Sequence, residues 1–148
     1  MAELTPHLAN HTIIGLDTNP FIYLFEGHPR YSPLAQELFS YLKLPQVTGV
    51  TSVITLIKTC VLPQRNGRTD LVETYERVLL NSQQVKMHHI DIALAKRATH
   101  LRAQYNIRVP DALQLSAALE HSATLFITND RRLQKITELS VLILDDYI

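Results

Sequence analysis

Three aspartates are the side chains of this sequence best suited to chemistry. Asp17 and Asp130 each follow a short apolar stretch that is typical of a buried strand, Ile13–Leu16 and Leu125–Thr128. Asp111 lies in the first turn of a helical segment that is apolar almost all round. Because the carboxyl ends of parallel strands lie at one edge of a sheet, we expect Asp17 and Asp130 to approach each other there.

Carboxylates that gather at one edge repel one another and cannot all stay ionised without a compensating cation. Such a cluster implies a bound hard metal, and Mg²⁺ or Mn²⁺ fits oxygen ligands of this kind. Each aspartate also has a local interpretation: Asp17 organises a turn, Asp111 complements a helix dipole, and Asp130 or Asn129 caps a helix. The occurrence of all three at one edge favours the metal site.

Strands and helices alternate along the chain, which predicts an α/β fold with a central, mainly parallel sheet of about five strands flanked by helices. The predicted strands are Ile13–Leu16, Val47–Val50, Val85–Ile90, Leu125–Thr128 and Val141–Leu144. Helices are predicted to begin near Asn19, Ser32, Ser52, Thr69 and Asp91, with two more over Val109–His121 and Arg131–Thr137. The absence of repeats, low-complexity tracts and linkers predicts a single domain over residues 1–148.

The predicted helix after Ser52 has two faces. Its apolar positions, expected to face the core, are Val53, Leu56, Ile57, Cys60 and Val61. Its polar stripe consists of Ser52, Thr55, Lys58 and Thr59. If this stripe faces the acidic edge of the sheet, the Lys58 ammonium lies beside the aspartates and lowers their pKa values.

Composition limits the partners and the compartment. The 148 residues carry 14 basic and 14 acidic side chains, so no global field attracts nucleic acid or a membrane surface. The single cysteine, Cys60, excludes a disulfide framework and indicates a reducing cytoplasm. The first twelve residues lack the apolar core of a signal peptide, and the longest uncharged run is too short and too broken to span a bilayer. We therefore expect a cytoplasmic protein with no membrane association.

Four ordered motifs resemble those of PIN-domain nucleases, a family that includes the VapC-type ribonuclease toxins. They are Asp17-Thr18-Asn19, Thr51-Ser52-x-Ile54-Thr55-Leu56, Pro110-Asp111-Ala112-Leu113-Gln114-Leu115 and Thr128-Asn129-Asp130-x-x-Leu133. The resemblance runs from about Ile13 to Leu144. It implies a PIN fold and a metal-dependent endoribonuclease, the toxin of a toxin–antitoxin pair, with a small antitoxin as partner and a homodimer as a family expectation.

The same resemblance assigns roles to individual residues. Asp17, Asp111 and Asp130 would be the catalytic residues and the ligands of Mg²⁺ or Mn²⁺. Polar support would come from Asn19, Thr128 and Asn129. The family usually has a glutamate where this chain has Lys58, which predicts weakened metal affinity and weakened cleavage.

Basic side chains near the predicted site are candidate contacts for RNA phosphates. They are Arg65 and Arg68 in a glycine-containing loop, and Arg131, Arg132 and Lys135 after the Asp130 turn. The alternative is ordinary solvated surface charge.

Two other functions remain open from the sequence. One is a PIN-shaped module that binds RNA or protein without cleaving, its site disabled by Lys58. The other is a phosphatase resembling the haloacid dehalogenases, with Asp17 as nucleophile. That class carries a second acid where this chain has Asn19, so the general acid would be missing.

Overall fold

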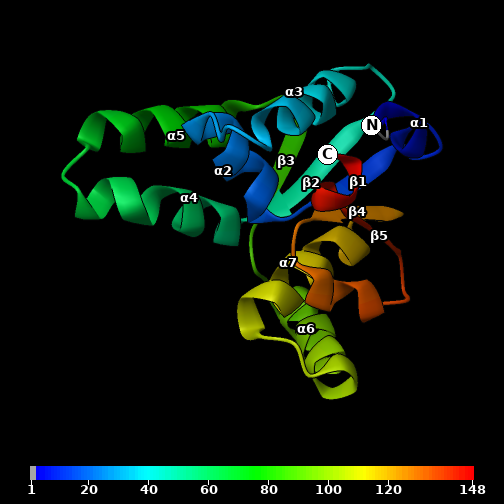
Figure 1. Ribbon diagram of the computed structural model, residues 1–148. Helices are drawn as coiled ribbons and strands as arrows, with labels where there is room; N and C mark the ends of the chain where they lie inside the picture. Colours follow the sequence, from blue (N-terminus) through cyan, green and yellow to red (C-terminus); the bar gives the residue numbers. More distant parts are fainter. Residues whose placement is uncertain (1–2) are drawn as a thin grey trace.

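The computed structural model describes residues 3–148, which fold around five parallel strands (Figure 1). The strands are β1 (Ile13–Leu16), β2 (Thr48–Ser52), β3 (Val85–His88), β4 (Leu125–Thr128) and β5 (Ser140–Ile143). Their spatial order is β3-β2-β1-β4-β5. The chain therefore winds outward from β1 on one side and from β4 on the other, and the direction of winding reverses between these two strands. In open α/β sheets, ligands bind at the carboxyl end of such a switch point.

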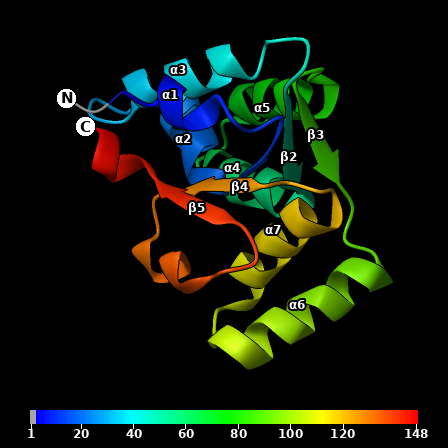
Figure 2. The same cartoon turned by 90° about the vertical axis from the view of Figure 1, so that its right-hand side faces the viewer.

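Helices cover both faces of the sheet (Figures 1 and 2). One face carries α1 (Thr5–Leu8), α2 (Thr18–Glu26), α3 (Ser32–Tyr41), α4 (Val53–Arg65) and α5 (Thr69–Asn81). The other carries α6 (Ile92–Tyr105), α7 (Val109–Glu120) and a 3₁₀ segment over Arg131–Lys135, and a second 3₁₀ segment, Leu144–Tyr147, ends the chain. None of the helices within residues 3–148 combines the length and the apolar character needed to cross a membrane. A cytoplasmic location stays a prediction.

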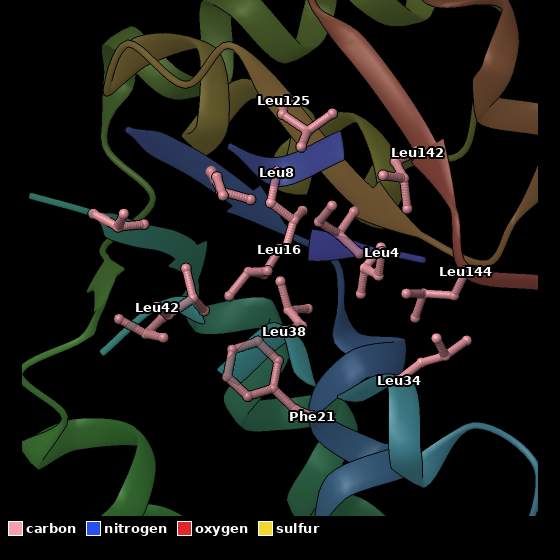
Figure 3. Close-up of a cluster of buried hydrophobic side chains, with 14 of the residues drawn as sticks. Leu4, Leu8, Leu16, Phe21, Leu34, Leu38, Leu42, Leu125, Leu142 and Leu144 are labelled. Atoms are coloured by element: carbon pink, nitrogen blue, oxygen red, sulfur yellow. The ribbon is translucent and has the colours of Figure 1, made fainter. Parts of the chain in front are cut away.

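The sheet separates two apolar cores because successive side chains of a strand point to opposite faces. Ile14, Leu16 and Leu125 belong to the core beneath α1, α2 and α3, part of which is drawn in Figure 3. Phe126, next to Leu125 in β4, belongs to the core beneath α6 and α7. The strands at the centre are thus covered on both sides, which explains their uninterrupted apolar sequence.

Gly15 sets the distance between β1 and α7. A Cβ atom at this position would lie 2.5 Å from Cβ of Ala118 and 3.0 Å from Cδ1 of Phe126. A glycine in β1 therefore allows α7 to pack directly against the centre of the sheet.

The fold class is confirmed: the sheet has five strands, and all of its pairings are parallel. Three of the predicted strands have ends that are wrong by one or two residues, which is usual at the ends of elements. The second strand runs from Thr48 to Ser52, the third ends at His88, and the last runs from Ser140 to Ile143. The predicted helix over Arg131–Thr137 is a shorter 3₁₀ segment.

The predicted core face of α4 is wrong. Thr55 and Thr59 are buried, whereas Ile57 is 60% exposed and Val61 is also exposed. The reason is visible in Figure 1, where α4 and α5 form a hairpin that extends beyond the sheet. The buried residues of α4 are Thr55 and Thr59 on the polar stripe, together with Pro63 near its end.

Two histidines connect β3 with the end of α7. The rings of His88 and His121 are stacked, with their centroids 3.3 Å apart and an angle of 10° between their planes. Burial lowers the pKa of His88, and the neighbouring His121, Lys86 and His89 lower it further. The neutral form of His88 is therefore favoured in the folded protein.

This arrangement makes stability depend on pH. Because the folded pKa of His88 is depressed, the folded protein binds fewer protons than the unfolded chain as pH falls below about 6.5, the ordinary histidine value. The free energy of unfolding should therefore decrease as pH falls through that value. Urea unfolding between pH 7.5 and pH 5 should show a flatter dependence for His88→Gln than for the unmodified protein. His100→Gln, which changes an exposed histidine of α6, should keep the original dependence; equal slopes for all three proteins would contradict this reading.

Candidate active site

Asp17 lies at the carboxyl end of β1, at the switch point of the sheet, and is only 4% exposed. Its Oδ1 accepts a hydrogen bond from the backbone N–H of Thr18 at 2.8 Å, and its Oδ2 accepts one from the hydroxyl of Thr128 at 2.7 Å. Burial raises the pKa of Asp17; the hydrogen bonds from Thr128 and Thr18 lower it. The carboxylate is thus rigidly held, and its charge is costly in this position.

Asn19 connects the start of α2 with the end of β4. Its Oδ1 accepts hydrogen bonds from the Thr128 hydroxyl at 3.3 Å and from the backbone N–H of Asn129 at 3.2 Å. The Asn129 side chain donates to the hydroxyl of Tyr23 at 3.0 Å. The helix predicted to begin near Asn19 begins at Thr18 and is capped by Asp17, which leaves the Asn19 side chain free to join β4.

Arg108, a residue that sequence reasoning missed, lies beside both Asp111 and Asp130. Asp111 is buried in the first turn of α7, and its Oδ2 lies 3.3 Å from Nε of Arg108. A second nitrogen of the same guanidinium lies 4.0 Å from Oδ2 of Asp130. The only available signal was the spacing of three positions between Arg108 and Asp111 across a helix start.

Asp130 also binds Arg132. Two nitrogens of the Arg132 guanidinium contact the carboxylate at 2.6–3.2 Å, and the backbone N–H of Arg132 donates to Oδ1 at 3.0 Å. These hydrogen bonds hold the pKa of Asp130 below its usual range. Asp130 is therefore an ionised carboxylate with a positive partner, unlike the buried Asp17.

Lys58 lies on the site side of α4. Its charge lowers the pKa of Asp17, while the charge of Asp111 raises it. Asp17 thus lies within electrostatic reach of both Lys58 and Asp111, and Arg108 joins Asp111 to Asp130. The structure gathers the three aspartates around one edge of the sheet together with cations of the chain itself.

Beneath this edge, Gln114 joins four elements in a buried hydrogen-bond network. The side chain of Gln114 on α7 is 1% exposed, and its Oε1 accepts a hydrogen bond from the Ser52 hydroxyl at 2.6 Å. Its Nε2 donates to Thr55 at 2.9 Å and to Thr18 at 3.1 Å. Thr51 completes the network through its contact with Thr55 at 2.7 Å. Gln114 is one of the few polar residues in a helix that is apolar almost all round, and this was the signal for its role.

The donor types at this edge match the oxygen ligands of a hard divalent cation, because three carboxylates lie around it. Their arrangement includes positive charges, and among residues 3–148 no three His, Cys, Asp or Glu side chains stand in positions ready to hold a metal ion. Asp17 contributes a buried carboxylate, whereas Asp111 and Asp130 are turned toward arginines. The three carboxylates suit a hard divalent cation, and binding of that cation requires the side chains of Arg108 and Arg132 to move away from Asp111 and Asp130.

The candidate RNA contacts divide into two groups. Arg131 and Arg132 follow Asp130 directly, and Arg131 binds Asp146 at 2.7 Å. Arg65 and Arg68 lie at the far end of the α4–α5 hairpin (Figure 1). Since α4 has 13 residues, that end is about 20 Å from the sheet edge. Only the first group adjoins the aspartates.

A separate cavity of about 440 Å³ lies between α2, α3 and α5. Its lining is mainly apolar and includes Phe21, Phe39 and Val78. None of the three aspartates lines this cavity, so the candidate site lies outside it.

Comparison with known proteins connects this geometry to a family. A sequence model described as the PIN domain matches residues 14–139, whereas no curated protein matches. A chain of a toxin–antitoxin complex from Klebsiella pneumoniae has 25% identity and a TM-score of 0.66, with 89% of this chain and 97% of that chain covered. VapBC2 from Rickettsia felis, bound to promoter DNA, has 20% identity and a TM-score of 0.68, with 88% and 98% covered. VapC20 from Mycobacterium tuberculosis, a toxin that cleaves the sarcin–ricin loop, has 18% identity and a TM-score of 0.66, with 86% and 98% covered.

The buried charge of Asp17 should cost stability in the absence of metal. Asp17→Asn keeps an acceptor for Thr18 and can donate to Thr128, so it should raise the Tm in EDTA at pH 7 by about 2–4 °C, or about 1 kcal/mol. The gain should shrink as pH falls through the raised pKa of Asp17, where the native carboxylate becomes protonated. Differential scanning calorimetry measures both effects. Asp70→Asn, at an exposed carboxylate bound by Arg68, should give no gain; a Tm for Asp17→Asn at or below that of the unmodified protein would contradict the argument.

Removal of the Gln114 amide from the buried hydrogen-bond network should lower the free energy of unfolding. Gln114→Leu leaves the hydroxyls of Ser52, Thr55 and Thr18 without this partner, at a cost of about 1–3 kcal/mol in the free energy of unfolding. Gln104→Leu makes the same change at an exposed position of α6 and should cost less than about 0.5 kcal/mol. Urea unfolding distinguishes the two, and equal effects would show that the network adds nothing to stability.

Proposed function

Because this chain belongs to the PIN domain family, whose sequence model covers residues 14–139, we propose that it is a metal-dependent endoribonuclease. The observation that carries the proposal is the position of Asp17 at the switch point of the sheet, within electrostatic reach of Asp111, which Arg108 links to Asp130. The family assignment favours this activity over that of a phosphatase resembling the haloacid dehalogenases.

Asp17, Asp111 and Asp130 would hold Mg²⁺ or Mn²⁺. When bound, such an ion supplies an activated water for attack on the phosphodiester and neutralises charge on the phosphate. Thr128 and the N–H of Thr18 orient the Asp17 carboxylate from both of its oxygens. Gln114 holds the first turns of α7, α4 and α2 together, which would help to keep Asp111 near Asp17.

The structural neighbours support a proposal for the substrate and the partner. The structural neighbours include a toxin–antitoxin complex, VapBC bound to DNA and FitAB bound to DNA. We propose that this chain is likewise the toxin of a pair, acts on RNA, and is held by a small antitoxin. Arg131 and Arg132, which adjoin Asp130, would contact the RNA backbone. A homodimer stays a prediction.

Lys58 is the observation that favours a second candidate, a PIN-shaped module that does not cleave. Its ammonium lies close enough to lower the pKa of Asp17, so it repels a divalent cation at the same place. If this chain is the proposed nuclease, it would then bind metal weakly and cleave RNA slowly. If it is the non-cleaving module, it would neither bind metal nor cleave RNA under any conditions.

An RNA-cleavage assay with and without Mn²⁺ tests the function. Labelled structured RNA should be cut in Mn²⁺, protected in EDTA, and left intact by Asp17→Asn and Asp111→Asn. The same preparations should not hydrolyse a generic phosphate ester. If RNA remains intact with the unmodified protein and with every variant, including Lys58→Glu, the non-catalytic module is the correct description.

Lys58→Glu should restore the missing acidic ligand. Mn²⁺ affinity should rise by about tenfold, within the range by which ligand-shell changes alter metal binding, and cleavage should rise with it. Isothermal titration and the RNA assay measure the two effects separately. Lys96→Glu, an exposed position of α6, makes the same charge change away from the site and should leave both unchanged. If Lys58→Glu behaves like this control, position 58 lies outside the site.

A further inference from the structure

The guanidinium of Arg108 contacts the carboxylates of two of the three candidate metal ligands, Asp111 and Asp130. Arg108 stands at the N-cap position of α7, in the connection from α6, and its side chain is 64% exposed. Its guanidinium lies 3.3 Å from Oδ2 of Asp111 and 4.0 Å from Oδ2 of Asp130. It therefore occupies space between the two carboxylates that a shared divalent cation would need.

These contacts are loose by the standards of charge-assisted hydrogen bonds, which are about 2.7–2.9 Å long. Arg132 makes a tighter contact with the same Asp130, at 2.6 Å. An exposed ion pair of the kind that Arg108 makes contributes about 0–1 kcal/mol, so it can be exchanged at little cost. Its carbonyl accepts a hydrogen bond from the backbone N–H of Ala112 at 2.9 Å in the first turn of α7, so the exchange requires only rotation of the side chain.

We propose that Arg108 exchanges partners during the reaction cycle of this site. In the metal-free protein, its guanidinium neutralises Asp111 and Asp130. When a divalent cation binds these carboxylates, Arg108 turns outward and binds a phosphate of the RNA. This inference rests on the proposed function, because it takes Asp111 and Asp130 as metal ligands and RNA as the substrate.

Two physical reasons support the exchange. A guanidinium and a divalent cation repel each other and cannot both lie between the same two carboxylates. The planar guanidinium also fits phosphate oxygens in a bidentate manner, and at 64% exposure it already reaches solvent at the mouth of the site. Arg132 is less suited to this role because two of its nitrogens and its backbone N–H are committed to Asp130.

The test measures two affinities on the full chain, in the native sequence and in the Lys58→Glu background. Electron paramagnetic resonance of free Mn²⁺ gives the metal Kd. Fluorescence anisotropy of a labelled single-stranded RNA in Mn²⁺ gives the RNA Kd at several salt concentrations, with gel electrophoresis to verify that the RNA stays intact. The variant is Arg108→Gln, and the matched control is Arg97→Gln, which removes the same charge from a pair with Glu120 on α7.

Arg108→Gln should change the two affinities in opposite directions. The Mn²⁺ Kd should fall about threefold or more, as loss of a competing exposed ion pair implies. The RNA Kd should rise, and the slope of log K against log salt should become smaller by about one, as loss of one phosphate contact implies. Arg97→Gln should leave both quantities as they are, which separates the effect from a general loss of positive charge.

Other outcomes overturn the inference. It is wrong if Arg108→Gln leaves Mn²⁺ binding unchanged or weakens it, if RNA binding and its salt slope do not change, or if Arg97→Gln has the same effects. Absence of Mn²⁺ binding in every variant overturns it together with the metal site. The proposed function fails separately if Lys58→Glu binds Mn²⁺ and RNA as expected but does not cleave.

Discussion

The hydrogen bond between the Thr128 hydroxyl and the Asp17 carboxylate depends on a single topological fact, the parallel pairing of β1 with β4. The two residues are 111 positions apart in the chain. Asp17 directly follows β1 and Thr128 is the last residue of β4, and the two strands end at the same edge of the sheet. Asn19 adds a second connection across the same pair of strands through Asn129. Every other element of the candidate site is arranged around this junction: α2 begins at it, and the Arg131 segment leaves from it.

The polar interior beneath the junction determines how α7 and α4 approach. Gly15 brings α7 close to β1, and Gln114 then finds three hydroxyl partners within 3.1 Å. Such a network specifies one arrangement, since a shifted helix would leave buried donors and acceptors unsatisfied. The acidic edge is thus held by two kinds of constraint, apolar contact on both faces of the sheet and a directional network at its carboxyl end.

The sequence predicted the parts of the site that local patterns encode. Buried strands are apolar without alternation, so the ends of β1 and β4 could be located, and with them Asp17 and Asp130. Periodicity states which residues of a helix share a face but not which face is covered, which is why the exposure of Ile57 on α4 was not foreseen. The roles of Arg108 and Gln114 were not predicted from the sequence, because they depend on partners that the fold brings from distant segments.

The strand order has a consequence for biosynthesis. A nascent chain forms β1, β2 and β3 long before β4 leaves the ribosome, and until then one side of β1 is an open, apolar strand edge. Translation that stops before Leu125 therefore yields a fragment that has Asp17 but neither Thr128 nor Asp130 beside it. Such fragments lack the assembled carboxylates and are exposed to aggregation, so the chain acquires the three aspartates together only once it extends past Asp130.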